Sequence, residues 1–266
     1  MPKSVENNQQ SEQSGLVISY FGNSVAVEAA DGQVFQCQLR RNQELPVVGD
    51  KVIWQLAPSG TGTISSILPR QSLLARGDSR GGSRPMAANL DCMLIVMAPP
   101  PIFSEYLVDR YLVAAELLGI EPILVMNKVD LLDEAGQEAT LARLRPYAEV
   151  PYPVVLSSVH ALDGLTTLKA ALVGKTAVLV GPSGVGKSSI IRALGVSEIK
   201  VGEVTAKGAG KHTTTATRLY HLPDGANLIE PDLVITQDGV LVARHENAIA
   251  ILNADGSVRE ATTDVV

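Results

Sequence analysis

The chain has 266 residues, enough for two compact domains, and 45% of them are hydrophobic although only 4% are aromatic. A formal net charge of −6 gives no sign of the basic surface that nucleic-acid binders carry, although a local basic patch at Arg40–Arg41 stays open. The two cysteines, Cys37 and Cys92, lie outside any metal-ligand spacing, so we expect buried thiols. No apolar run is long enough to cross a bilayer and no signal core is present, which predicts a cytoplasmic protein without a membrane partner.

The first 75 residues predict an arm followed by a small β-barrel. Residues 1–14 are polar, which indicates a disordered arm. Residues 15–75 contain five short apolar runs separated by turn residues: LVISYF, SVAVEA, QVFQCQL, DKVIWQL and GTISSIL. Five strands in so short a segment are typical of an oligonucleotide/oligosaccharide-binding (OB) barrel. We expect Phe35 and Trp54 to lie in its core rather than to stack on a ligand.

The rest of the chain predicts an α/β domain. Residues 76–88 are rich in Gly, Ser and Arg and indicate a linker or mobile loop, and residues 89–228 then alternate strands with helices. The expected strands are 90–98, 122–127, 153–158, 176–181, 217–222 and 226–230, and the expected helices are 104–119, 132–147 and 188–195. Apolar strands between helices predict a mainly parallel sheet with helices on both faces.

A phosphate loop is predicted at GPSGVGKSS, which fits G-x-x-x-x-G-K-[ST] between a strand and a helix. The glycines let backbone N–H groups turn toward phosphates, and the helix N-terminus adds positive potential. We expect Lys187 to bridge the β- and γ-phosphates as a catalytic residue and Ser188 to bind Mg²⁺ through its hydroxyl. The expected phosphate-binding residues are Gly181, Pro182, Ser183, Gly184, Val185, Gly186, Lys187, Ser188 and Ser189.

A base-reading motif, Asn127-Lys128-Val129-Asp130, ends the second of these strands. The Asp130 carboxylate can accept from the ring N–H and the amino group of guanine, whereas adenine would leave it unpaired. Ser157 and Ser158 end the next strand and are expected to support the base. The four-residue motif alone occurs by chance in turns, but beside a phosphate loop it predicts a guanine-nucleotide site with Asn127, Lys128 and Asp130 as ligands.

The motif order points to one family. The base-reading motif precedes the phosphate loop, the reverse of ordinary small GTPases, as a circular permutation would produce. With Lys211-His-Thr-Thr-Thr215 behind the loop and a barrel in front, residues 15 to about 228 closely resemble the ribosome small-subunit-dependent GTPase A family. The segments LRRN (39–42), DRYLV (109–113) and GIEP (119–122) add to the resemblance. It implies a circularly permuted P-loop GTPase domain behind an OB barrel.

The resemblance also implies a function. Members of the family are GTPases of late small (30S) ribosomal subunit maturation, with hydrolysis stimulated by the subunit. GTP, GDP, the small subunit and its rRNA would then be partners, and we expect a monomer. Arginines at 40, 41, 76, 80 and 84 are candidates for phosphate contacts with the rRNA.

The first switch would lie at Gly210–Thr215 by the same resemblance. Thr214 or Thr215 would complete the Mg²⁺ shell with Ser188 and sense the γ-phosphate, with Thr214 the assigned ligand. His212 occupies the place of a histidine proposed to help hydrolysis, or it only orders the loop.

The chain departs from the family at the second switch. Glu230-Pro231-Asp232-Leu233 stands where D-x-P-G is expected, so Glu230 or Asp232 would have to replace the acidic residue. No cysteine follows Cys92, so the zinc of the family is not expected. The alternative to a GTPase is therefore a GTP-binding protein deficient in hydrolysis.

Residues 229–266 instead resemble an internal stretch of glycerophosphodiester phosphodiesterases, whose Glu-x-Asp pair binds a divalent metal. Glu230 and Asp232 match that pair, Asp238-Gly239 predicts a hairpin turn, and His245-Glu246 follows the next strand. About 40 residues cannot close an eight-stranded barrel. We therefore interpret this tail as a fused or misassembled gene end without phosphodiesterase activity.

Overall fold

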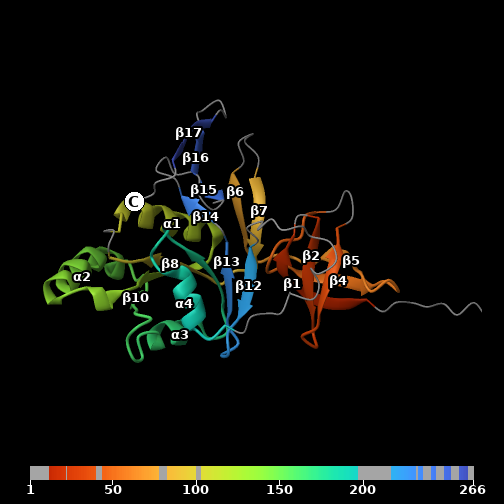
Figure 1. Ribbon diagram of the computed structural model, residues 1–266, viewed down its shortest axis with the longest axis horizontal. Helices are drawn as coiled ribbons and strands as arrows, with labels where there is room; N and C mark the ends of the chain where they lie inside the picture. Colours follow the sequence, from red (N-terminus) through yellow and green to blue (C-terminus); the bar gives the residue numbers. More distant parts are fainter. Residues whose placement is uncertain are drawn as a thin grey trace, which may run out of the picture.

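The computed structural model describes residues 12–21, 23–39, 44–77, 83–99, 103–196, 217–231, 233–235, 241–243, 249–252 and 258–262. Within these ranges a barrel and an α/β domain lie side by side and share one eleven-stranded sheet (Figure 1). No described helix has the length and apolar character needed to cross a membrane.

The barrel is the OB type that the sequence predicts. Its strands are β1 (Gln13–Tyr20), β2 (Ser24–Ala29), β3 (Val34–Gln38), β4 (Lys51–Leu56) and β5 (Gly62–Ile67). They pair in the order β1-β2-β3-β5-β4, and β4 closes the barrel on β1. Trp54 is fully buried in its core, with its ring 4.8 Å from that of Phe35. Gln13 and Ser14, expected in a disordered arm, belong to β1 because they pair with Trp54 and Ile53.

The α/β domain has a five-stranded parallel sheet with one antiparallel strand at its edge. The strands are β8 (Cys92–Met97), β9 (Glu121–Met126), β10 (Val154–Leu156), β11 (Thr176–Val180), β12 (Arg218–His221) and β13 (Asn227–Glu230). Strands β10-β9-β8-β11-β13 are parallel, and β12 runs antiparallel to β13. The helices are α1 (Glu105–Leu118), α2 (Glu134–Glu149), α3 (Thr166–Leu172), α4 (Lys187–Ala193) and a 3₁₀ turn η1 (Val129–Leu131).

Helices cover both faces of this sheet (Figure 1). Successive residues of a strand point to opposite faces, so Met93, Ile95 and Met97 pack with α1 and α2, while Leu94 and Val96 pack with α3 and α4. The predicted α/β fold is therefore confirmed. The sequence did not predict α3, whose seven residues are too few for a clear helical period.

A hairpin replaces the predicted linker at 76–88. It consists of β6 (Leu73–Gly77) and β7 (Ser83–Ala88), and the Gly-rich residues 78–82 between them lie outside the described ranges. Ala87 and Ala88 are buried, and Ala88 N–H donates to the Val48 carbonyl of the barrel at 2.9 Å. Residues 83–88 form a strand because Ala87 and Ala88 pack in the core at the base of the hairpin. The high Gly and Arg content of the segment gives no sign of this packing.

The barrel is joined to the α/β domain by strand pairing and by a shared core. β1 pairs with β12 at Ser19 and Arg218, next to a bulge between Val17 and Ser19. His221 at the end of β12 lies 2.7 Å from the Glu28 carboxylate of β2. Ile18 and Ala26 of the barrel belong to the same hydrophobic cluster as Leu219 and Ile229 of the α/β domain.

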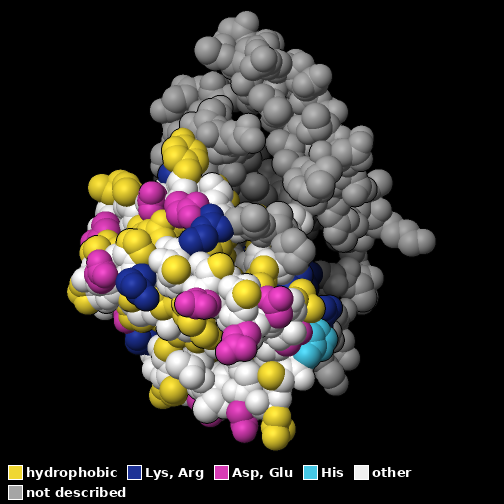
Figure 2. Space-filling model, turned by 90° about the vertical axis from the view of Figure 1, so that its left-hand side faces the viewer, with side chains coloured by type: hydrophobic (Ala, Val, Ile, Leu, Met, Phe, Trp, Pro, Cys, Tyr) yellow, Lys and Arg dark blue, Asp and Glu magenta, His cyan; other side chains and the backbone are white. Residues whose placement is uncertain are grey.

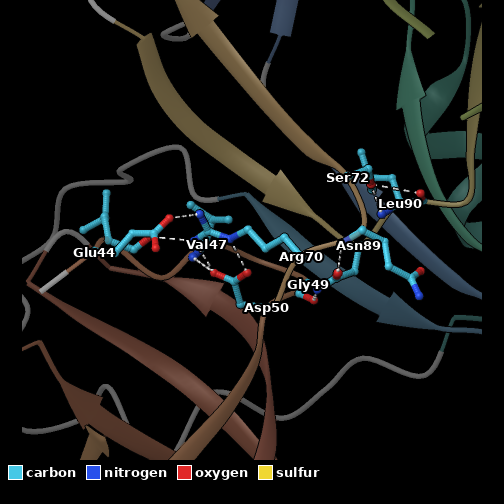
Figure 3. A network of polar contacts seen from close by, with 10 residues as sticks. Glu44, Val47, Gly49, Asp50, Arg70, Ser72, Asn89 and Leu90 are labelled. Atoms are coloured by element: carbon cyan, nitrogen blue, oxygen red, sulfur yellow. Dashed lines mark hydrogen bonds and ion pairs between the residues drawn. The ribbon is translucent and has the colours of Figure 1, made fainter. Parts of the chain in front are cut away.

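A polar network supports the connection after β5 (Figure 3). The fully buried Asp50 carboxylate accepts from Arg70 Nε at 2.7 Å, from Arg70 Nη2 at 2.8 Å and from Val47 N–H at 2.7 Å. The hydrogen bond with Asp50 raises the pKa of the Arg70 guanidinium, which also pairs with Glu44. Asn89, left-handed at φ 56°, donates to the Gly49 carbonyl at 2.8 Å and so holds the barrel loop at the entry to β8.

The C-terminal residues form two separate antiparallel hairpins. One pairs β14 (Leu233–Ile235) with β15 (Leu241–Ala243), and the other pairs β16 (Ile249–Leu252) with β17 (Val258–Thr262). Ile235 stands opposite Leu241, as expected for a hairpin around Asp238-Gly239, although those two residues and His245-Glu246 lie outside the described ranges.

Candidate nucleotide site

The phosphate loop connects β11 to α4 through three glycines in conformations that other residues rarely adopt. Gly181, Gly184 and Gly186 have φ of 140°, 82° and 96°. A Cβ on Gly181 would lie 2.3 Å from the Val96 carbonyl oxygen, and one on Gly186 would lie 2.5 Å from Asn127 Nδ2. The loop can therefore approach Val96 and Asn127 this closely only because positions 181 and 186 lack side chains.

Two polar side chains at the start of α4 point back to the loop and the sheet. Lys187 Nζ donates to the carbonyls of Gly181 at 2.8 Å and Pro182 at 2.9 Å, so the ammonium group lies over the loop. Ser188 Oγ donates to Glu230 Oε1 at 3.1 Å. Glu230 is the last residue of β13, which pairs in parallel with β11. The hydroxyl expected to bind Mg²⁺ thus already has a carboxylate beside it.

The base-reading motif is bonded directly to the phosphate loop. Asn127 is fully buried, donates from Nδ2 to the Val185 carbonyl at 2.9 Å and accepts from Ser157 Oγ at 3.2 Å. Lys128, left-handed at φ 58°, donates from Nζ to the Gly184 carbonyl at 2.6 Å. Side chains from β9 therefore fix the loop that follows β11, and the two motifs form one site.

Asp130 is exposed and is held by Ser158. The Ser158 hydroxyl donates to Asp130 Oδ1 and accepts from the N–H groups of His160 at 3.1 Å and Ala161 at 3.2 Å. The Ser158 hydrogen bond lowers the pKa of Asp130, so its carboxylate stays ionised to a lower pH than an ordinary aspartate. An oriented, ionised carboxylate is the acceptor that a guanine edge requires.

The carboxyl ends of the parallel strands β9, β10, β11 and β13 bring these residues to one edge of the sheet. The structure groups Asn127, Lys128, Asp130, Ser157, Ser158, Glu230 and all of Gly181–Ser189 there. His212, Thr214, Thr215, Asp232 and the arginines at 40, 41 and 80 lie outside the described residues.

Sequence reasoning missed an apolar wall beside the phosphate loop. A cavity of about 100 Å³ lies between Pro182 and Val185 of the loop and α1, where Leu107, Val108 and Tyr111 line it. No local motif marks this cavity, and the only sequence signal is the high apolar content of α1.

The side chains at the loop fit Mg²⁺. Among the described residues, no cluster of three or more His, Cys, Asp or Glu side chains could hold a metal ion by itself. Mg²⁺ usually takes only one or two protein oxygens together with phosphates and water. Ser188 Oγ and Glu230 Oε1 supply such a hydroxyl and a carboxylate oxygen.

Fold and motif geometry together define a circularly permuted P-loop GTPase domain behind an OB barrel. Residues 67–231 match the RsgA GTPase family, and the chain belongs to that family. Over 225 residues it is 48% identical to the small ribosomal subunit biogenesis GTPase RsgA of Pseudomonas savastanoi pv. phaseolicola, which covers 82% of this chain and 66% of the relative. Over 224 residues it is 48% identical to the Pseudomonas aeruginosa protein of that name, covering 82% and 65%. The chain thus spans slightly less than two thirds of the length of these relatives.

Two solved structures have the same arrangement. YjeQ from Thermotoga maritima superposes with a TM-score of 0.66 at 30% identity, covering 83% of this chain and 75% of that one. YloQ, described as a circularly permuted GTPase, gives a TM-score of 0.60 at 26% identity, covering 84% and 72%.

Proposed function

We propose that this chain binds GTP and GDP with Mg²⁺ and hydrolyses GTP as a cytoplasmic factor in late maturation of the small ribosomal subunit. The observation that carries the proposal is the bonding of Asn127 and Lys128 to the carbonyls of Val185 and Gly184, which makes base reading and phosphate binding one site. The names of the similar proteins support the small subunit as partner.

Each residue of the site has a role in this proposal. Backbone N–H groups of Gly181–Ser189 bind the phosphates, and Lys187 turns from the loop carbonyls toward the β- and γ-phosphates. Ser188 and Glu230 would hold Mg²⁺, which when bound would supply positive charge against the phosphate oxygens. Thr214 as a further Mg²⁺ ligand and His212 as an aid to hydrolysis stay part of the proposal by family resemblance.

Contact with rRNA is assigned to the barrel and its neighbouring hairpin. The candidate residues are Arg40, Arg41, Arg76, Arg80 and Arg84. Phosphate contacts release counterions, so affinity for the subunit should fall as salt is added. A salt-independent affinity would contradict this assignment.

Substitution of Asp130 tests the base assignment. In Asp130→Asn, affinity for GDP should fall about 100-fold or more, and affinity for xanthosine diphosphate should rise because its 2-oxo group accepts from the new amide. Displacement of a fluorescent GDP analogue measures both. Asp133→Asn is the matched control, since Asp133 only caps α2 through Gly136 N–H and asparagine caps equally well. Equal affinity of the unsubstituted protein for ATP and GTP would refute the assignment.

A second candidate is a GTP-binding protein that hydrolyses GTP poorly. The sequence after β13 favours it, because Glu230-Pro231 stands in place of D-x-P-G and the glycine that would meet the γ-phosphate is absent from this position. Single-turnover hydrolysis with and without purified small subunits separates the two. Acceleration by subunits supports the GTPase, whereas normal GDP affinity with no turnover in either condition supports the second candidate.

The phosphodiesterase resemblance has less support. The hydrogen bond between Glu230 and Ser188 favours a place for this carboxylate in the nucleotide site. Phosphodiesterase activity would be supported only if the protein released glycerol phosphate from a glycerophosphodiester and Glu230→Ala abolished that release.

A further inference from the structure

Helix α1 has apolar side chains on its inner side and also on part of its outer side. Ten of its 14 residues are apolar, and its inner side, which includes Val108 and Tyr111, packs into the core. On the outer side Tyr106, Val113 and Leu117 are 54%, 58% and 83% exposed. Their spacing of seven and then four residues aligns them in one stripe. The stripe also contains Arg110, whose guanidinium lies 5.4 Å from the Tyr106 ring centroid and donates to the Tyr106 hydroxyl. Exposed apolar side chains gathered in one stripe are suited to contact another molecule.

The surroundings of this stripe are acidic. Residues 104–150, which include α1, β9 and α2, contain nine acidic and four basic residues, among which Asp130 belongs to the nucleotide site and Glu121 is paired with Lys175. Of the four basic residues, Arg143 is paired with Glu105, Lys128 is bonded to the phosphate loop and Arg110 lies in the stripe. Glu134 and Glu138 are exposed on α2. Figure 2, which views the molecule from the α2 end, shows hydrophobic, acidic and basic side chains intermixed on this surface. We call the stripe and these acidic residues the α1–α2 face.

We propose that the α1–α2 face binds a basic protein segment with apolar side chains, and, because the inference rests on the proposed function, that a small-subunit protein supplies it. The acidic residues repel RNA phosphates, so rRNA is the wrong partner for this face. They equally oppose a second copy of this chain, whose identical face carries the same charge. A basic segment gains from the charge, and its apolar side chains cover the stripe.

Helix α1 lies between the proposed partner and the phosphate loop. The outer side of the helix carries the stripe, and its inner residues Leu107, Val108 and Tyr111 line the cavity beside Pro182 and Val185 of the phosphate loop. A partner on the outer side therefore binds the element that lies directly against the nucleotide site. This is a physical route by which the subunit could influence nucleotide turnover.

Opposite charge changes at the same two positions test the proposal. The double substitution Val113→Lys/Leu117→Lys removes apolar contact and adds positive charge, so affinity for purified small subunits should fall about tenfold. The double substitution Val113→Glu/Leu117→Glu removes the same contact but keeps the sign of the face, so the loss should be about threefold. Leu162→Lys, at a side chain 95% exposed before α3, is the matched control and should bind as the unsubstituted protein does. Co-sedimentation measures affinity, and unchanged GDP affinity verifies folding.

Each other outcome overturns the proposal. Tighter binding of the lysine pair would mean that the face meets rRNA, and equal affinity of all variants would mean that it meets nothing on the subunit. A photo-crosslinking residue at Val113 should form adducts with a subunit protein, whereas adducts with rRNA, a second copy or the same chain would assign another occupant. If the unsubstituted protein binds GDP but does not sediment with subunits, the proposed function fails as well. If it sediments normally and only the variants behave unexpectedly, this inference alone fails.

Discussion

At the scale of single residues, Gly184 and Gly186 show that a phosphate-loop glycine can be needed for its backbone conformation alone or also for the space that a side chain would fill. Both are left-handed, with φ of 82° and 96°, and a side chain at either position is strained by about 1–2 kcal/mol. A Cβ on Gly184 meets nothing within 4 Å, whereas one on Gly186 would lie 2.5 Å from Asn127 Nδ2. Only Gly186 is therefore required for contact between the loop and the base-reading motif.

We predict that Gly186→Ala weakens GDP binding far more than Gly184→Ala does. The methyl group at 186 displaces the Asn127 amide from the Val185 carbonyl, so strain and a lost buried hydrogen bond together should lower affinity about 100-fold or more. At 184 strain acts alone and a loss of about tenfold is expected. Titration with a fluorescent GDP analogue measures both constants, and equal losses would contradict the contact with Asn127.

How much of the site could be predicted depends on sequence distance. Asn127, Asp130 and Lys187 belong to short motifs whose spacing encodes their chemistry, and the structure brings these motifs into contact. The hydrogen bond between Ser188 and Glu230 joins residues 42 positions apart. The sequence alone could not decide whether Glu230 or Asp232 takes the place of the acidic residue of the second switch. Pairing of β11 with β13 decides which residues meet across the sheet, and that information is absent from either motif.

At the scale of elements, the connection after β5 depends on one buried charge pair. Asp50 is fully buried and the Arg70 side chain is only 10% exposed, so neither charge has water as an alternative partner. Arg70 also donates to the Leu45 carbonyl at 3.0 Å, which ties the loop before β4 to the residues after β5. Loss of the Asp50 carboxylate removes both of its hydrogen bonds with Arg70 and leaves the guanidinium with only the exposed Glu44 carboxylate and the Leu45 carbonyl as partners.

We predict that Asp50→Ala lowers the free energy of unfolding by about 3 kcal/mol, the lower end for a broken buried ion pair, because Glu44 still pairs with Arg70. Asp31→Ala is the control, because Asp31 accepts one backbone hydrogen bond, from Gln33 N–H, in an exposed turn and should contribute less than about 1 kcal/mol. Urea unfolding followed by tryptophan fluorescence suits this comparison, since the single tryptophan lies in the barrel core. Similar losses in the two variants would show that the Asp50 charge is not essential.

Element prediction failed where composition and packing disagree. The strands of the barrel and of the parallel sheet are apolar runs bounded by turn residues, and these were predictable. Residues 76–88 looked like a linker because Gly, Ser and Arg dominate them, yet Ala87 and Ala88 are buried at the base of β7. The bridge from Val48 to Ala87 that stabilises this strand comes from the barrel, about 40 residues away in the chain and invisible to local composition.

At the scale of the whole molecule, the two predicted domains are one structure in the described part of the chain. The sheet continues from β12 into β1, and one hydrophobic cluster contains Ile18 and Val48 of the barrel segment with Ile95 and Leu219 of the α/β domain. Opening the barrel would expose apolar surface of the α/β domain as well. We therefore expect the two parts to unfold together.

The two cysteines allow this expectation to be measured, because Cys37 lies in the barrel core and Cys92 at the start of β8. Burial raises the pKa of each thiol to about 12, so at pH 8.5 almost no thiolate exists in the folded protein. In an unfolded chain the thiol pKa is about 8.5, and both residues should then react with iodoacetamide. We predict that pulses of the reagent at increasing urea label both cysteines over the same concentration range, as mass spectrometry of the two peptides can resolve. Labelling of Cys37 at lower urea with Cys92 still protected would mean that the barrel opens by itself, and the pairing of β1 with β12 would then be too weak to make the sheet one cooperative unit.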